Sequence, residues 1–145
     1  HHYGHEQLGV ALIDAVCARL RVPKKHQQVA RLVSKFHTHC HRAMELRADT
    51  MLRLFESLDA FRRPEQVAQF LLACEADSRG RTGFEDKEYP QADFLRGALV
   101  AATSVNIAEL LKDLAPSEEK GPEKIKAAIA QARTEAIAKA IGKAA

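Results

Sequence analysis

Residues 6–23 read EQLGVALIDAVCARLRVP, and this stretch indicates most plainly how the chain folds. Its apolar residues recur with the spacing of one face of an α-helix. These residues are Leu8, Ala11, Leu12, Ala15, Val16 and Leu20. Pro23 should end the helix, because a proline disfavours helical geometry in the residue before it. The stretch therefore predicts an amphipathic helix that ends in a tight turn.

Helical periodicity continues along the rest of the chain. A second helix is expected from about Lys24 to the histidine cluster, and a third near Met51, capped by Asp49 or Thr50. A short helix should cover Ile107 to Leu114. Three other helices should begin with a proline in the first turn, where proline is tolerated. These prolines are Pro64, Pro90 and Pro122.

No segment alternates apolar and polar residues as a half-buried strand does. The sequence therefore predicts an all-α fold, a compact helical domain of about six or seven helices.

Composition narrows the class of protein. The 145 residues, of which 46% are hydrophobic, suit one globular domain with its own core. Three widely spaced cysteines, Cys17, Cys40 and Cys74, argue against a disulfide framework and for a cytoplasmic protein. No apolar run approaches the roughly 20 residues of a membrane span, so no membrane partner is expected. A net charge of +3 is compatible with a polyanionic partner.

All seven histidines fall within the first 41 residues. In a helix, His37 and His41 would lie one turn apart on one face, a spacing that can hold a metal ion, whereas His39 would point elsewhere. Only His37 is in register with the apolar face, so His39 and His41 should be solvated. The alternative is that these histidines simply complement the negative end of the helix.

A second group of histidines, His1, His2 and His5, lies near the start of the chain. The Pro23 turn should make the first two helices antiparallel neighbours. The start of one then lies beside the end of the other, which predicts that His5 approaches His37 in a shared site.

Two segments place acidic residues ahead of paired arginines. Residues 59–63 read DAFRR, and residues 75–81 read EADSRGR. Arg62, Arg63, Arg79 and Arg81 are therefore candidates for contacts with RNA or other phosphates. The acids ahead of these arginines could serve a metal or hold the arginines in ion pairs, and such ion pairs are at least as well supported by the pattern.

Several of these segments resemble one known family, the bacterial CCA-adding tRNA nucleotidyltransferases of the multifunctional, HD-domain type. The resemblance is dense up to about Leu99 and looser in the tail, and it favours native sequence over a purification-tag remnant for His1 and His2. The matching segments are HYGHE at 2–6, FH at 36–37, HRAMELR at 41–47, DAFRRPE at 59–65, EADSRGR at 75–81 and YPQAD at 89–93.

The resemblance implies a larger enzyme of which this chain is the C-terminal portion. An N-terminal head of the family adds C, C and A to tRNA with Mg²⁺, CTP and ATP, and none of that head is present here. The resemblance makes residues 1–115 the downstream part of an HD-type helical domain and residues 116–145 a C-terminal connector and helix.

The HD domain of the family is associated with metal-dependent phosphohydrolase activity, including 2′,3′-cyclic phosphodiesterase and 2′-nucleotidase activity, with Ni²⁺ or another divalent metal. The His-Asp dyad that provides its core ligands does not occur in this sequence. The resemblance implies that His37 is catalytic and that His37, His5 and His2 are metal ligands. Without the dyad, the chain alone is expected to be inactive.

Two other classes of function stay open. The chain could be a stand-alone helical tRNA- or RNA-binding module without catalysis, which would use the four arginines. It could also be a structural or dimerisation body, and a homodimer is one expected form. Salt-dependent tRNA binding would favour the first class, and concentration-dependent size without RNA binding would favour the second.

Overall fold

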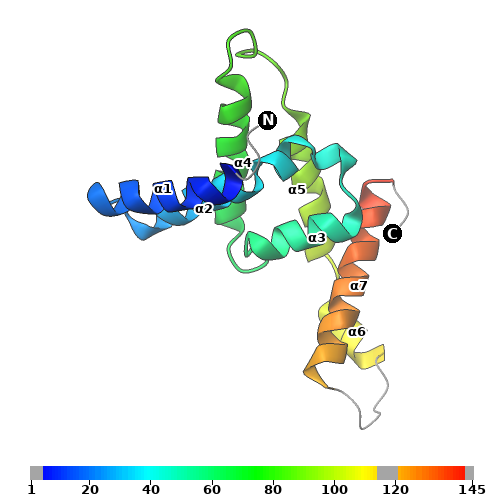
Figure 1. Cartoon of the computed structure of the whole chain (residues 1–145). Helices are drawn as coiled ribbons and strands as arrows, with labels where there is room; N and C mark the ends of the chain where they lie inside the picture. Colours follow the sequence, from blue (N-terminus) through cyan, green and yellow to red (C-terminus); the bar gives the residue numbers. More distant parts are fainter. Residues whose placement is uncertain (1–4, 114–120, 143–145) are drawn as a thin grey trace.

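The computed structural model describes residues 5–113 and 121–142, and within those ranges it contains α-helices and no strand. The prediction of an all-α fold with about six or seven helices is confirmed. Figure 1 shows their arrangement. The helices are α1 (His5–Arg19), α2 (Lys24–His41), α3 (Ala48–Ser57), α4 (Pro64–Arg79), α5 (Pro90–Thr103), α6 (Ile107–Asp113) and α7 (Pro122–Ala140), with a 3₁₀ turn, η1 (Ala43–Glu45), between α2 and α3.

The core lies where α3, α4, α5 and α7 meet. Helix α7 packs against both α5 and α3, and it contributes the fully buried Ile137. The buried side chains of α3, α4 and α5 recur at helical spacing, as the apolar periodicity predicts. The largest of them are Met51, Phe55, Phe70, Leu71 and Leu95.

The proline starts are confirmed, because Pro64, Pro90 and Pro122 each occupy the first turn of a helix. The predicted cap of α3 is wrong. Its N-cap residue is Arg47, and Asp49 instead lies inside the first turn, where its carboxylate pairs with Arg53 at 2.9 Å. A first-turn carboxylate still complements the positive helix end.

Helices α1 and α2 form an antiparallel pair at one edge of the molecule (Figure 1). Gly9 faces Ser34 so closely that a Cβ atom at residue 9 would collide with Ser34 Oγ. The connecting turn places Arg21 in the left-handed region, at a φ of 53°. Close packing at Gly9 therefore fixes the register of the pair, with residue 5 about one turn beyond the Ser34 level.

The apolar stripe of α1 does not face the core. Its large side chains point to solvent, with exposed fractions of 69% for Leu8, 68% for Leu12, 45% for Val16 and 62% for Leu20. The helix instead turns its opposite face toward α2, and that face includes the buried Cys17. The amphipathic pattern of this segment located the helix but did not identify the face that packs in this structure.

Residues 90–112 reach the length and composition of a membrane span, with a mean hydropathy of 1.4, contrary to the expectation that no such run exists. The structure divides this run into α5 and α6. Leu95, Ala98 and Ala102 are buried where α5 packs in the core. This burial accounts for part of the apolar character of the run.

Candidate functional site

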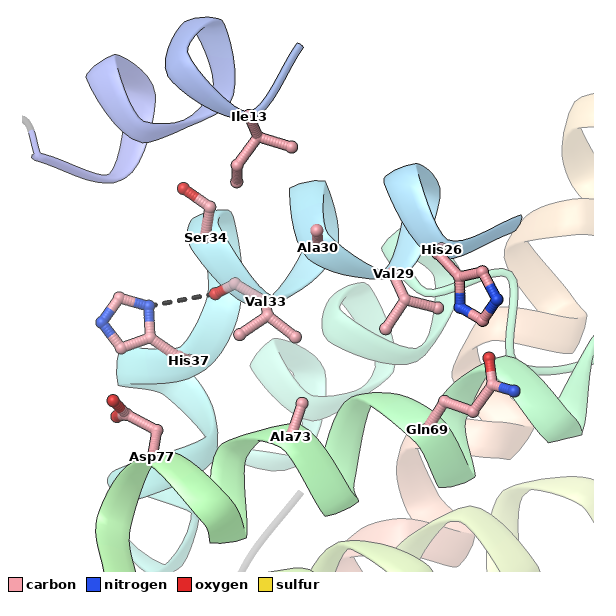
Figure 2. Close-up of a pocket in the computed structure, with 10 residues that line it drawn as sticks. All are labelled: Ile13, His26, Val29, Ala30, Val33, Ser34, His37, Gln69, Ala73 and Asp77. Carbon is pink, nitrogen blue, oxygen red and sulfur yellow. Dashed lines mark hydrogen bonds between the residues drawn. The ribbon is translucent and has the colours of Figure 1, made fainter. Parts of the chain in front are cut away.

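A groove of about 680 Å³ runs between α1, α2 and α4 (Figure 2). Its middle is apolar, formed by short aliphatic side chains, and its two ends are polar. His26 and Gln69 lie at one end, and His37 and Asp77 lie at the other. The apolar middle is lined by Ile13, Val29, Ala30, Val33 and Ala73, with Ser34 beside Ile13.

The His37 ring is held in one orientation by its own helix. Its Nδ1 lies 3.0 Å from the Val33 carbonyl oxygen, which can only accept a hydrogen bond, so Nδ1 carries the proton. In the neutral ring Nε2 is then the basic nitrogen. A histidine whose Nδ1 donates to a backbone carbonyl is oriented as metal-ligating and proton-accepting histidines are.

His41 is enclosed by two partners from distant parts of the chain. Its Nε2 lies 2.9 Å from Asp77 Oδ2, and its Nδ1 lies 2.8 Å from the Tyr89 hydroxyl. Only 21% of its side chain is exposed, so the prediction that His41 is solvated is wrong. The His37 and His41 rings meet edge to face at 5.8 Å, which places both imidazoles at the same end of the groove.

These contacts also fix the protons on His41. The Asp77 carboxylate accepts, so Nε2 carries a proton, and Nδ1 of the neutral ring accepts from the Tyr89 hydroxyl. That hydroxyl also lies 3.4 Å from Cys40 Sγ. Burial, together with the contact to Cys40, raises the pKa of Tyr89 and keeps the phenol protonated.

Two thiols adjoin these hydrogen bonds, Cys40 next to Tyr89 and Cys74 next to Cys40. Cys40 and Cys74 are fully buried, and both are free cysteines. A hydrogen bond with Cys40, and burial, raise the pKa of the Cys74 thiol. Buried thiols of this kind act as small apolar side chains in the packing of α2 against α4.

His39 lies away from this site, as its position in the helix predicts, but it is not solvated. It is partly buried, its Nδ1 is buried without a hydrogen-bond partner, and its ring meets the edge of Phe36 at 6.0 Å. The expectation of a solvated His39 is therefore also wrong.

The described residues do not complete a metal site. Among them, no three His, Cys, Asp or Glu side chains gather in a way that could hold a metal ion. Both nitrogens of His41 are engaged by Asp77 and Tyr89. His37, with its Nδ1 on the Val33 carbonyl, stays the predicted ligand at this end of the groove.

The side chains of the remaining predicted ligands, His5 and His2, lie outside the part of the chain that the structure describes. The backbone of His5 begins α1, and the antiparallel register brings it near the end of α2 where His37 lies. Its side chain is not among those described, and neither is His2, so their approach to His37 stays a prediction.

The candidate phosphate-binding arginines are divided between the two ends of α4, and three of them have carboxylate partners. Asp59 Oδ2 lies 3.2 Å from Arg63 Nε, and Asp59 Oδ1 lies 3.9 Å from Arg62 Nε. Glu75 lies 3.0 Å from Arg79. These are the ion pairs that the sequence offered as an alternative, and they are partly exposed and individually weak. A role of these arginines and of Arg81 in RNA binding stays a prediction.

The sequence pattern does not connect Asp77 or Tyr89 with the histidines. It offers Asp77 only as one of the acids ahead of the arginines, for a metal or an ion pair, and Tyr89 only as part of a segment that resembles the family. One signal was available: Asp77 follows the buried positions of α4 at helical spacing, three residues after Cys74. Tyr89 precedes a proline-initiated helix, and nothing local connects it to His41.

The chain is similar in sequence to bacterial proteins that all have the same name. The chain is 52% identical over 112 residues to the multifunctional CCA protein of Thioalkalivibrio sulfidiphilus, covering 77% of this chain and 27% of that protein. It is 49% identical over 120 residues to the multifunctional CCA protein of Pseudomonas syringae pv. syringae, which covers 83% of this chain and 29% of that protein. It is 50% identical over 131 residues to the multifunctional CCA protein of Nitrosococcus oceani, which covers 88% of this chain and 32% of that protein.

The chain thus spans about a quarter to a third of the length of the curated relatives it matches. No family model matches it, and no solved structure matches it.

Proposed function

We propose that this chain, a homologue of one part of the multifunctional CCA proteins, is the C-terminal portion of a bacterial enzyme that adds C, C and A to the 3′ ends of tRNA. About half of the aligned residues are identical over three quarters of the chain, which supports a shared role within a longer protein. Nucleotide addition, with tRNA, CTP, ATP and Mg²⁺, would belong to a part of the enzyme outside these residues. A tRNA-processing enzyme of this kind would work in the cytoplasm.

We further propose that the polar end of the groove belongs to a phosphohydrolase site. The observation that carries this proposal is the orientation of His37. Its Nδ1 is tied to the Val33 carbonyl, so its Nε2 is the nitrogen that can accept a proton or bind a cation. Asp77 lines the same end of the groove, and its carboxylate accepts a hydrogen bond from His41 Nε2 at 2.9 Å.

His37 would be one member of a larger ligand set. No three metal-ligating side chains gather among the described residues, so the other ligands would come from His5, His2 and the part of the enzyme that carries the His-Asp dyad. For the same reason the 145 residues alone should show negligible hydrolysis of 2′,3′-cyclic nucleotides. The identity of the metal, Ni²⁺ or another divalent cation, is part of the proposal.

The test is His37→Ala in the full-length enzyme. We expect hydrolysis of 2′,3′-cyclic nucleotides to fall about 100-fold or more, as removal of a ligand or general base does, while CCA addition is unchanged. His26→Ala is the matched control, because it removes the same side chain from the opposite end of the same groove. Both rates and the melting temperature are measured on each preparation.

Parallel loss of both activities with a lowered melting temperature would remove His37 from the site, because it would indicate lost folded protein. Unchanged hydrolysis in His37→Ala would do so as well. Equal loss of hydrolysis in His37→Ala and His26→Ala would assign the effect to the groove as a whole.

The RNA-binding module without catalysis is less well supported. Three of its four arginines have carboxylate partners that phosphates would have to displace. The contacts of these arginines hold them in ion pairs, whereas the contact of His37 with the Val33 carbonyl orients its ring for binding a proton or a cation.

A further inference from the structure

The outer face of α1 is a continuous apolar surface. It consists of Leu8, Leu12, Val16 and Leu20, which follow one another at four-residue spacing. Leu20 lies just past the end of α1, but its backbone NH still bonds to the Val16 carbonyl at 2.9 Å, which continues the helical turn. Ala11 and Ala15 are exposed on the same side and add no bulk. The face is about 18 Å long, from the rise of a helix over twelve residues.

The opposite face of the same helix is already packed. Gly9 lies against Ser34, Ile13 reaches the groove, and Cys17 is buried. Helix α1 is therefore apolar on both sides. A single exposed leucine is normal on a protein surface, but a helix that is apolar all round is typical of one buried on both sides.

We propose that the outer face of α1 is an internal interface of the full-length protein, covered by a helix from the part of the chain that precedes residue 1. The relatives are longer than this chain by a wide margin, since it spans only 27–32% of the three compared here. The face begins at Leu8, close to the point where a preceding segment would join. Because the small side chains of Ala11 and Ala15 leave room between the larger leucines, another helix can pack closely against this face.

The size of the face favours an intramolecular partner over a second copy. It offers four large apolar side chains, whereas a stable association of separate molecules typically buries about 800 Å² and 20–30 residues per partner. A segment of the same chain needs less area, because its effective concentration is already in the millimolar range. The inference rests on the proposal that this chain is the C-terminal portion of a longer protein, and not on the chemistry proposed for His37.

The test uses Leu12→Cys in the full-length protein, with Leu72→Cys as the matched control. The two positions have nearly equal exposed fractions in this structure, 68% and 65%. Each variant is labelled with a maleimide, and the modified peptides are measured by mass spectrometry, natively and in denaturant. We expect Leu12→Cys to label about tenfold or more slowly in the native protein than in denaturant, the protection given by a packed interface. A benzophenone maleimide on the fraction that does react should then cross-link to a peptide upstream of residue 1.

Native labelling of Leu12→Cys at a rate close to that in denaturant would overturn the proposal. Protection that is lost on dilution, with cross-links between molecules, would assign the face to a second copy and would also overturn it. Slow labelling with an intramolecular cross-link to an upstream peptide supports it, whatever the outcome of His37→Ala.

Discussion

At the scale of single residues, His41 joins three parts of the fold. Its ring belongs to α2, its Nε2 contacts Asp77 of α4, and its Nδ1 contacts Tyr89, which precedes α5. We expect His41→Ala to lower the free energy of unfolding by about 2–3 kcal/mol, because it leaves the buried Tyr89 hydroxyl without this partner. Urea denaturation compares it with His26→Ala, an exposed histidine of the same helix, which should change stability by less than about 0.5 kcal/mol. Similar losses in both variants would contradict this role.

Tyr89 should make stability depend on alkaline pH. Its folded pKa is raised, chiefly by burial, while the unfolded chain ionises near the ordinary value of about 10. Above that pH the unfolded state has lost a proton that the folded state keeps, so the unfolded state is favoured. Stability should then fall by up to about 1.4 kcal/mol per pH unit from this group.

Tyr89→Phe isolates the effect, because it keeps the ring and removes the ionisable hydroxyl. The variant should be less stable near neutral pH but should lose less stability between neutral pH and values above about 10. Parallel pH profiles for the two proteins, from urea denaturation at each pH, would show that Tyr89 does not contribute.

The sequence allowed only half of this site to be predicted. The face of His37 follows from helical periodicity, which is local information. The partners of His41 lie 36 and 48 residues away along the chain, so no local pattern could connect them. His41 was therefore expected in solvent, although two tertiary contacts hold it.

At the scale of helices, Gly9 sets the distance between α1 and α2. We expect Gly9→Ala to destabilise the protein despite the better helix propensity of alanine, because the added Cβ collides with Ser34 Oγ. Gly97→Ala is the opposite case, since Gly97 is at an exposed position of α5 and an added Cβ there meets nothing within 4 Å. That change should stabilise by about 0.5–1 kcal/mol.

Thermal denaturation of both variants measures the difference. If Gly9→Ala and Gly97→Ala raise the melting temperature alike, the close approach at Ser34 does not constrain the pair. Gly9→Ala combined with Ser34→Ala should recover part of the loss, because the colliding oxygen is removed.

Helix positions were predicted better than helix faces. Prolines in the first turn located the starts of α4, α5 and α7, since the missing NH of proline costs nothing there. The cap of α3 was misplaced because Asp49 and Thr50 are good capping residues that also suit a first turn. The packed face of α1 could not be deduced, because both of its faces are apolar.

At the scale of the whole molecule, α7 completes the core. Ile137 is fully buried, and α7 lies against both α3 and α5. We expect Ile137→Ala to destabilise by about 2–5 kcal/mol, the cost of a cavity in a packed core. Lys139→Ala, at an exposed position on the same helix, should change stability by less than about 0.5 kcal/mol. Equal melting temperatures for the two variants would show that α7 is dispensable to the core.

The position of α7 also has a consequence for the order of events during synthesis. The turn between α1 and α2 is short, so those two helices can pair soon after they leave the ribosome. Helix α3 must instead wait for α7, which lies more than 60 residues further along the chain. Until then the apolar side of α3, with Met51 and Phe55, lacks one of its covers, and a nascent chain in this state is a natural client for chaperones. Core closure in this protein is therefore expected to come well after α1 and α2 have paired.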